Sequence, residues 1–266
     1  MDKTVNFNTN LLDWSRLDIP ENRSSLSQKE LLEKVYSLIP SDMGNVLDVG
    51  ARDCFIGEII SDVVEFTIAI DLVLSHKKRN VDILPIVGTG CDLPFNEHSF
   101  DIVLCLEVLE HIPAQAVPVM ASELSRVTGK YVLVGVPFEQ DIRLGKTTCA
   151  HCNRVNPPWG HRNTFSLEKL RALFPELVTR GFYFSGASKN RTNWLSSALM
   201  SFSGNPNGTY NQIEKCIYCN ELLLKPTEVS KVKKLCSSFA RFLNRVQRPF
   251  VSTRPSHIHI LFEKID

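Results

Sequence analysis

The amino-acid sequence predicts an α/β fold built on a mostly parallel sheet. Apolar, strand-like segments alternate with helical segments from Val46 to Val136, as they do where parallel strands are joined by helical crossovers. Two of these strands end in an acidic residue, Asp48 and Asp71, at the edge where such sheets bind ligands. The 266 residues suffice for one elaborated domain with a small insertion, and two large domains are not expected.

The remaining elements follow from periodicity and from residues that cap or break helices. Ser27 and Glu30 form a capping box for a helix that ends before Pro40. Ser166 caps a later helix, and residues 257–264 alternate as a strand does. The other expected elements are strands at 46–49, 65–71, ahead of Gly88, from Ser99, at 130–136 and at 181–185, and a helix over 114–127.

The turn after the first strand is the entry to a nucleotide-type pocket. Gly50 follows the strand, and an apolar-periodic helical segment begins near Phe55. A dinucleotide-binding turn would also place glycines where Arg52 and Phe55 stand. The turn therefore suits a ligand without a pyrophosphate, approached by the carboxylate of Asp48. Asp71 lies about 20 residues beyond Gly50, the spacing at which a carboxylate binds ribose hydroxyls.

Three further motifs occur in order: Asp-Leu-Pro-Phe from Asp92, Phe-Asp-Ile-Val from Phe100, and Glu-Val-Leu-Glu-His from Glu107. Together with Leu-Asp-Val-Gly ending at Gly50, they resemble a class I S-adenosylmethionine-dependent methyltransferase over residues 45–137. The resemblance implies a Rossmann-like, seven-stranded, mostly parallel sheet with helices on both faces and an antiparallel last strand.

The resemblance also implies how S-adenosylmethionine is bound. The acid matching Asp48 and the loop at Gly50 approach the methionine part, Asp71 binds the ribose, and Asp92 lies by the adenine amine. The neighbouring positions implied as cofactor contacts are Ala51, Arg52, Leu72, Cys91, Leu93 and Leu106.

Methyl transfer requires a positioned nucleophile and, for some substrates, a base. Glu107, Glu110 and His111 resemble the carboxylate and histidine set of ubiquinone-pathway and small-RNA ribose methyltransferases, which predicts a divalent-metal or general-base site. The alternative is that these acids simply occupy the first turn of a helix. His161 follows the fifth strand and is a second candidate base or substrate contact, or else a hydrogen-bonded loop histidine.

Cys149, Cys152, Cys216 and Cys219 form two Cys-x-x-Cys pairs, which offer four thiolates to a tetrahedral structural zinc ion. Unligated thiols or a redox pair are the alternatives, and His151 or His161 could replace a cysteine ligand. Between the two pairs, Asn-Pro-Pro-Trp at residues 156–159 resembles the motif with which adenine-N6 and glutamine-N5 methyltransferases hold a planar amine. In those enzymes the motif directly follows the fourth strand, so its position here argues against an amine-binding role.

The predicted organisation is an N-terminal arm (1–24), a methyltransferase domain (25–188 and 256–266) and an insertion (189–255) that the cysteine pairs clamp to residues 138–165. The arm could fold over the cofactor or remain a loosely docked tail. The insertion contains a basic amphipathic helix over about 228–246, whose apolar side we expect to pack against the domain. A nucleic acid, an anionic lipid or a protein partner is the alternative for this helix.

We therefore expect a methyltransferase acting on an oxygen, nitrogen or carbon nucleophile of a small molecule or biosynthetic intermediate. An RNA or protein methyltransferase and a non-catalytic cofactor-binding scaffold are the alternatives. The net charge of +1 makes a nucleic acid an unlikely partner, and no apolar run reaches the ~20 residues of a membrane span. Without a leader segment, a cytoplasmic location is expected. The sequence carries no signal of oligomeric state.

Overall fold

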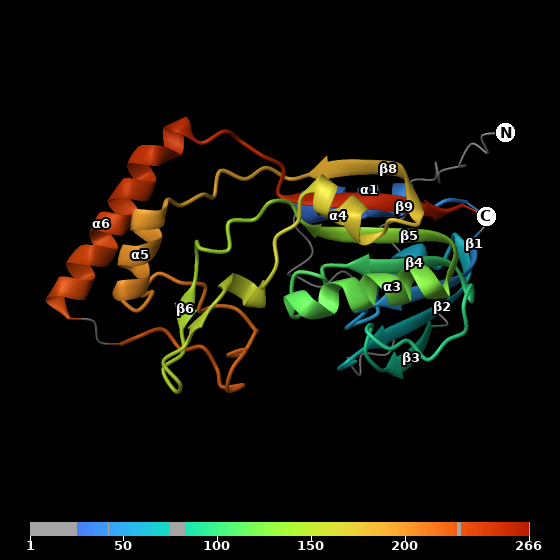
Figure 1. Cartoon of the computed structure of the whole chain (residues 1–266), viewed down its shortest axis with the longest axis horizontal. Coiled ribbons are helices and arrows are strands. Elements are labelled where there is room, and N and C mark those ends of the chain that lie inside the picture. Colours follow the sequence, from blue (N-terminus) through green and yellow to red (C-terminus); the bar gives the residue numbers. More distant parts are fainter. Residues whose placement is uncertain (1–25, 42, 75–82, 228–229, 266) are drawn as a thin grey trace.

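The computed structural model describes residues 26–41, 43–74, 83–227 and 230–265. Its centre is a seven-stranded sheet with the strand order β3-β2-β1-β4-β5-β9-β8 (Figure 1). The strands are β1 (Met43–Val49), β2 (Val64–Asp71), β3 (Ile83–Val87), β4 (Phe100–Leu106), β5 (Thr128–Pro137), β8 (Leu177–Ser185) and β9 (His257–Lys264).

Strands β1 to β5 are parallel, and β9 runs antiparallel to both β5 and β8. This confirms the predicted Rossmann-like sheet with an antiparallel last strand. The predicted bounds of β9 are reproduced, because its alternation continues over its whole length. β8 begins at Leu177, earlier than expected, because Leu177–Thr179 pair with the end of β9 before a register shift between Thr179 and Gly181.

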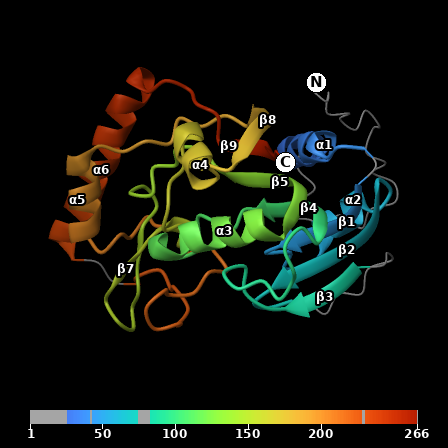
Figure 2. The same ribbon diagram turned by 45° about the vertical axis from the view of Figure 1, so that its right-hand side comes forward.

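Helices cover both faces of the sheet (Figure 2). One face packs on α1 (Leu26–Leu38) and α2 (Phe55–Ile60), and the other on α3 (Val117–Val127) and α4 (Leu167–Leu173). Alternate residues of β1 and β4 enter the two cores, so both faces of these central strands are apolar and fully buried. This burial fixes the strand register, since a one-residue slip would exchange the two faces.

Two long connections lie beyond the carboxyl end of β5 (Figure 1). The first contains β6 (Thr147–Thr148), β7 (Val155–Asn156) and the 3-10 turn η4 (Pro158–Gly160). The second, between β8 and β9, contains α5 (Trp194–Phe202), α6 (Lys231–Gln247) and η5 (Arg248–Phe250). Among the helices of the described residues, none combines the length and the apolarity that crossing a bilayer requires.

One alternative was wrong, and two expectations fall outside the description. α1 already includes Leu26, one residue before the predicted cap, and the side chains of Ser27 and Glu30 lie outside the described residues. Residues 107–113 form turns, and the helical elements after β4 begin only at η3 (Ala114–Ala116). The predicted helical segment over 114–127 is therefore confirmed, and the alternative that Glu107 and Glu110 occupy a first helical turn is wrong. Pro113 disfavours helical backbone at the residue before it. The N-terminal arm (1–24) lies outside the described residues.

Candidate active site

The loop after β1 is built from left-handed backbone. Gly50, Arg52 and Cys54 have φ values of 81°, 46° and 56°. The Gly50 N–H donates to the Ile70 carbonyl at 2.8 Å, which ties the loop to β2. A Cβ atom on Gly50 would lie 2.2 Å from Cγ2 of Val108, so the approach of the two loops requires glycine here.

Asp71 holds the same loop from the end of β2. Its Oδ2 accepts the Arg52 N–H at 2.9 Å, and its Oδ1 accepts the Val73 N–H at 3.0 Å. Each oxygen keeps a further lone pair for a ligand hydroxyl. The residue predicted to bind ribose is therefore also the residue that positions the glycine loop.

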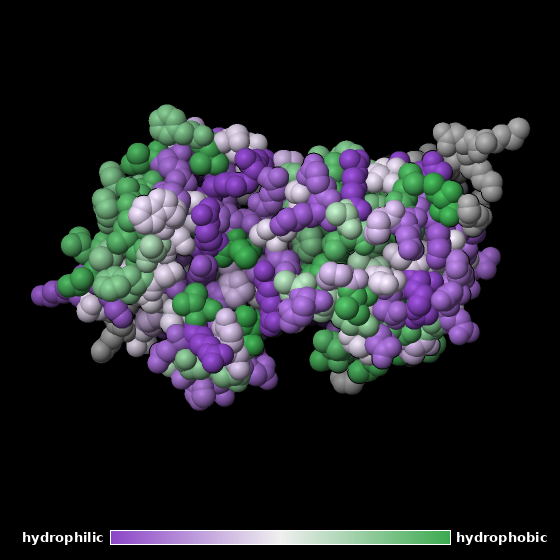
Figure 3. All heavy atoms as spheres, in the orientation of Figure 1, coloured by the Kyte–Doolittle hydropathy of each residue, from purple (hydrophilic) through white to green (hydrophobic). Residues whose placement is uncertain are grey.

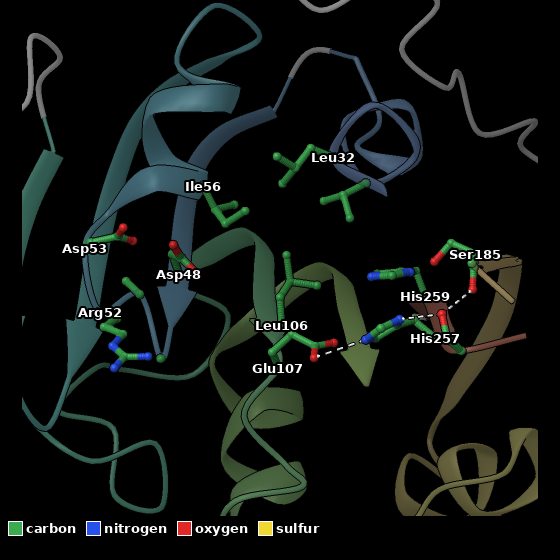
Figure 4. Close-up of a pocket in the computed structure, with 15 residues that line it drawn as sticks. Leu32, Asp48, Arg52, Asp53, Ile56, Leu106, Glu107, Ser185, His257 and His259 are labelled. Atoms are coloured by element: carbon green, nitrogen blue, oxygen red, sulfur yellow. Dashed lines mark hydrogen bonds and ion pairs between the residues drawn. The ribbon is translucent and has the colours of Figure 1, made fainter. Parts of the chain in front are cut away.

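A cavity of about 450 Å³ opens at the carboxyl ends of β1 and β4 (Figure 4). Five of the predicted cofactor residues line it, together with Glu107: Asp48, Gly50, Ala51, Arg52 and Leu106. Leu32 and Val35 of α1 close one side. The opposite wall comes from the end of β8 and the start of β9, with Ser185, Gly186, Ser256, His257 and His259.

The other five predicted cofactor residues do not line this cavity: Asp71, Leu72, Cys91, Asp92 and Leu93. Leu72 is exposed beside Asp71, and Leu93 is buried. The loop of Asp92 is held by α3, because Glu123 accepts the Leu93 N–H at 2.7 Å and Arg126 donates to the Leu93 and Phe95 carbonyls. α3 thus fixes the loop that carries the predicted adenine contact.

Glu107 faces His257 across the cavity (Figure 4), with 3.6 Å between Oε2 and Nε2. Ser256 Oγ donates to the Ser185 carbonyl at 3.0 Å, so it accepts from Nδ1 of His257, also at 3.0 Å. Nε2 is then the basic nitrogen of the neutral ring. Burial lowers the pKa of His257, but the hydrogen bond and charge of Glu107 outweigh it and raise the pKa.

The pKa values of Glu107 and Glu110 are shifted in opposite directions. Burial and the charge of Glu107 raise the pKa of Glu110 to about 9, and neither of its carboxyl oxygens has a hydrogen-bond partner among the described residues. Burial would also raise the pKa of Glu107, but His257 lowers it overall. At neutral pH, Glu107 is therefore ionised and Glu110 protonated.

The segment Gly160–Asn163 is joined to the turn after β4. The Asn163 side chain donates to the Leu109 and Ile112 carbonyls at 2.9 and 2.8 Å, and the Arg162 N–H donates to the Glu110 carbonyl at 2.6 Å. These bonds bring the ring of His161 against that of His111, with centroids 4.7 Å apart. One ligand atom from each of Glu110, His111 and His161 lies within 4.8 Å of the others, a spacing that could hold a metal ion.

His161 lines a second cavity of about 680 Å³, which shares Ser256 and His257 with the first. Its Nδ1 lies 2.6 Å from Gln140 Oε1, and burial and the charge of His111 lower its pKa to about 4. His161 is therefore neutral at pH 7. His111 lines neither cavity and faces a surface hollow beside Cys216 and Cys219. The three predicted catalytic residues thus line three different hollows, although the rings of His111 and His161 are in contact.

The four paired cysteines meet in one cluster between the two long connections. Their Sγ atoms lie within 4.8 Å of one another, with Cys149 and Cys152 each 3.6 Å from a cysteine of the other pair. Each pair is followed by an asparagine with left-handed backbone, Asn153 or Asn220, whose N–H donates to the carbonyl of the first cysteine at 2.9 Å. The matching turns point all four thiols inward, as a tetrahedral zinc site requires.

Asn156 of the Asn-Pro-Pro-Trp segment supports this cluster and does not line the cofactor cavity. It is buried, and its Oδ1 accepts the Ile217 N–H of the second cysteine turn at 2.9 Å. Trp159 lines the second cavity.

Sequence reasoning missed the wall formed by Ser185, Ser256, His257 and His259. These residues lie far from the recognised motifs, and the pairing of β9 with β5 and of β8 with β9 brings them to the site. The available signal was the alternation of His257 and His259 on one face of the last predicted strand.

The fold and this cavity define a class of protein. Residues 47–131 match the family model described as a methyltransferase domain. The match covers 85 of the 266 residues, so this part of the chain is similar to a methyltransferase domain. None of the curated proteins searched matches this chain significantly.

Solved structures with little sequence identity share the fold. A candidate methyltransferase from Bacillus halodurans is 14% identical, with a TM-score of 0.51 over 89% of this chain and 98% of that chain. An S-adenosylmethionine-dependent methyltransferase from Methanosarcina mazei is 12% identical, with a TM-score of 0.50 over 87% and 97%. The [4+2]-cyclase SpnF is also 12% identical, with a TM-score of 0.50 over 97% and 87%. The fold therefore occurs with more than one chemistry, and function depends on the site.

The pairing of Glu107 with His257 predicts a measurable titration. Because the carboxylate favours the imidazolium form, the Cε1–H resonance of His257 should titrate above the ordinary pKa of about 6.5. Replacing Glu107 by glutamine should lower that value. Glu214→Gln, which removes a carboxylate near His111, is the control and should leave His257 unchanged. An unshifted His257 in Glu107→Gln would show that the two side chains do not interact.

Proposed function

We propose that the protein transfers a methyl group from S-adenosylmethionine to an oxygen, nitrogen or carbon nucleophile of a small molecule or biosynthetic intermediate. One observation carries the proposal. The cavity lined by predicted cofactor residues adjoins a second cavity, and His257 belongs to both walls. A methyl donor in the first cavity and an acceptor in the second would meet beside this histidine.

The residues of the first cavity suit the chemistry of the cofactor. Asp48 offers a buried carboxylate to an ammonium group, and Gly50, Ala51 and Arg52 of the loop line the cavity beside it. The remaining lone pairs of Asp71 suit ribose hydroxyls at the rim. When bound, the cofactor supplies an activated methyl group, so the protein contributes mainly position and proton transfer.

His257 is the proposed base. Its Nε2 accepts the proton of the acceptor group, and Glu107 stabilises the imidazolium that forms. The hydrogen bond to Ser256 fixes the tautomer and the ring orientation. His161, neutral and held by Gln140, is proposed to contact the acceptor in the second cavity. His111 is proposed to position the His161 ring from behind.

The second cavity supports a small acceptor. Its volume of about 680 Å³ lies in the range of small-molecule sites, and its wall combines Trp159 with polar and charged side chains. Arg191 and Arg254 both pair with Glu139 there, so this group of three side chains carries one net positive charge. A non-catalytic scaffold would have no need of the ion pair between Glu107 and His257 where the two cavities meet.

Structural zinc is the second part of the proposal. Four cysteines complete a tetrahedral shell, so no position remains for a substrate and the ion would serve to join the two long connections. The surrounding buried cluster is small, with Cys149, Cys216 and Leu223 as its fully buried members. A metal ion would compensate for this limited apolar core.

Titration of the zinc-loaded protein with S-adenosylmethionine and S-adenosylhomocysteine tests the cofactor assignment. We expect micromolar binding that Asp71→Asn weakens about 10-fold or more, because a charged acceptor is lost. Asp62→Asn is the matched control, since this carboxylate accepts a hydrogen bond from Tyr36 on the surface away from the cavity. Absence of binding by folded protein would refute the proposal.

Replacing Cys216 by serine tests the zinc site. We expect the bound zinc to fall from one ion per chain to none, with a loss of about 4 kcal/mol or more in the free energy of unfolding. Cys236→Ser is the control, because Cys236 lies on α6 outside the cluster and should change neither quantity. Equal zinc content in both variants would contradict the assignment.

A further inference from the structure

Helix α6 packs with its polar side inward. Ser237 and Ala240 are the buried residues of the helix. Asn244 Oδ1 accepts from Thr192 Oγ1 at 2.9 Å, and Gln247 exchanges hydrogen bonds with Asn193 and the Arg191 carbonyl at 2.9 and 3.0 Å. A surface helix of a globular protein ordinarily turns its apolar stripe to the core, whereas α6 buries Ala240 and half-buries Cys236 and Leu243 but exposes its other large apolar side chains. The expectation that its apolar side packs on the domain was wrong.

The apolar stripe of α6 faces outward. Leu235, Phe239 and Phe242 are 72%, 49% and 57% exposed, and Phe250 of η5 is 87% exposed. Val232 and Val246 continue the stripe, and Trp194 and Phe202 of α5 are exposed beside it. Figure 3 shows the hydrophobic side chains gathered at the end of the molecule that α5 and α6 form. Exposed apolar surface on this scale marks an interaction site.

Basic side chains lie close to this apolar surface. Residues 230–250 contain six basic side chains and no acidic one. All six are exposed, and none forms an ion pair with an acid among the described residues. By helical position, Lys231, Lys234, Arg241 and Arg245 lie on the side of α6 between its apolar stripe and its buried face, Lys233 lies near the buried face in the first turn, and Arg248 begins η5.

We propose that α6, with α5 and η5, docks the protein on the surface of a bilayer that contains anionic lipids. An apolar stripe of Leu and Phe next to a purely basic flank is the pattern of a helix that lies in the membrane interface. The apolar side chains enter the acyl boundary, the cations meet the anionic headgroups, and Trp194 suits the boundary itself.

Two other occupants fit less well. A second copy docked through this face in a symmetric dimer would bring two sets of six cations together, with no acid on α6 to compensate them. A nucleic acid would satisfy the cations but leave the stripe of Leu235, Phe239 and Phe242 in water.

Sedimentation with vesicles tests the proposal and needs no cofactor. The zinc-loaded full chain should bind vesicles of phosphatidylcholine with about one-third phosphatidylglycerol, and bind phosphatidylcholine alone and high-salt samples much more weakly. Phe239→Ser with Phe242→Ser should weaken binding about 10-fold or more. Val119→Ser, at an exposed apolar position of α3, should have no effect.

A charge-reversal pair separates the electrostatic part. Lys234→Glu with Arg241→Glu should weaken vesicle binding by well over about 25-fold, since the loss of each cation costs about 5-fold and the two new carboxylates are repelled by the anionic surface. Lys215→Glu with Lys225→Glu, two exposed lysines outside α6, is the control and should bind as the parent does. Failure of the parent to bind anionic vesicles would overturn the proposal. So would a concentration-dependent dimer that Phe239→Ser with Phe242→Ser dissociates, or binding to RNA in place of vesicles.

Discussion

The close approach of two loops at Gly50 is the constraint on which the site depends. β1 must reverse into α2 within a few residues, while the turn after β4 passes directly over it at Val108. Left-handed backbone at Gly50, Arg52 and Cys54 makes this reversal, and hydrogen bonds to Ile70 and Asp71 hold it against β2. The Val108 side chain packs directly on Gly50 at this crossing, so a side chain on Gly50 would push apart the two loops that border the cavity.

The acid–base chemistry of the site depends on the residues that the end of β8 and the start of β9 place on the cavity wall. β9 lies antiparallel beside β5, so its first residues stand next to the last residues of the parallel strands. His257 consequently meets Glu107, and the buried Glu110 behind them is held neutral. Glu107 is ionised and Glu110 is protonated, and the pKa is raised in His257 and lowered in His161 and His259. Shifted pKa values of this kind cluster at active sites.

Much of this arrangement could be predicted from the sequence, and the rest depended on tertiary contacts. Strand periodicity predicted the sheet, and the motifs placed Asp48, Gly50 and Glu107 at its edge. The role of His257 was not predictable from local sequence, because strand order determines what lies opposite Glu107. The amphipathic pattern of α6 predicted its two faces but not which one packs inward. Hydrogen bonds from Thr192 and Asn193 to Asn244 and Gln247 decide that.

The most direct test compares alanine at two glycines with left-handed backbone, Gly50 and Gly204, with φ values of 81° and 78°. A Cβ on Gly204 has nothing within 4 Å, whereas one on Gly50 meets Val108 at 2.2 Å. Both variants carry a backbone strain of about 1–2 kcal/mol, and only Gly50→Ala adds the clash. We measure the affinity for S-adenosylhomocysteine. A loss of about 10-fold or more in Gly50→Ala, with Gly204→Ala unchanged, is predicted, and equal affinities would contradict the account.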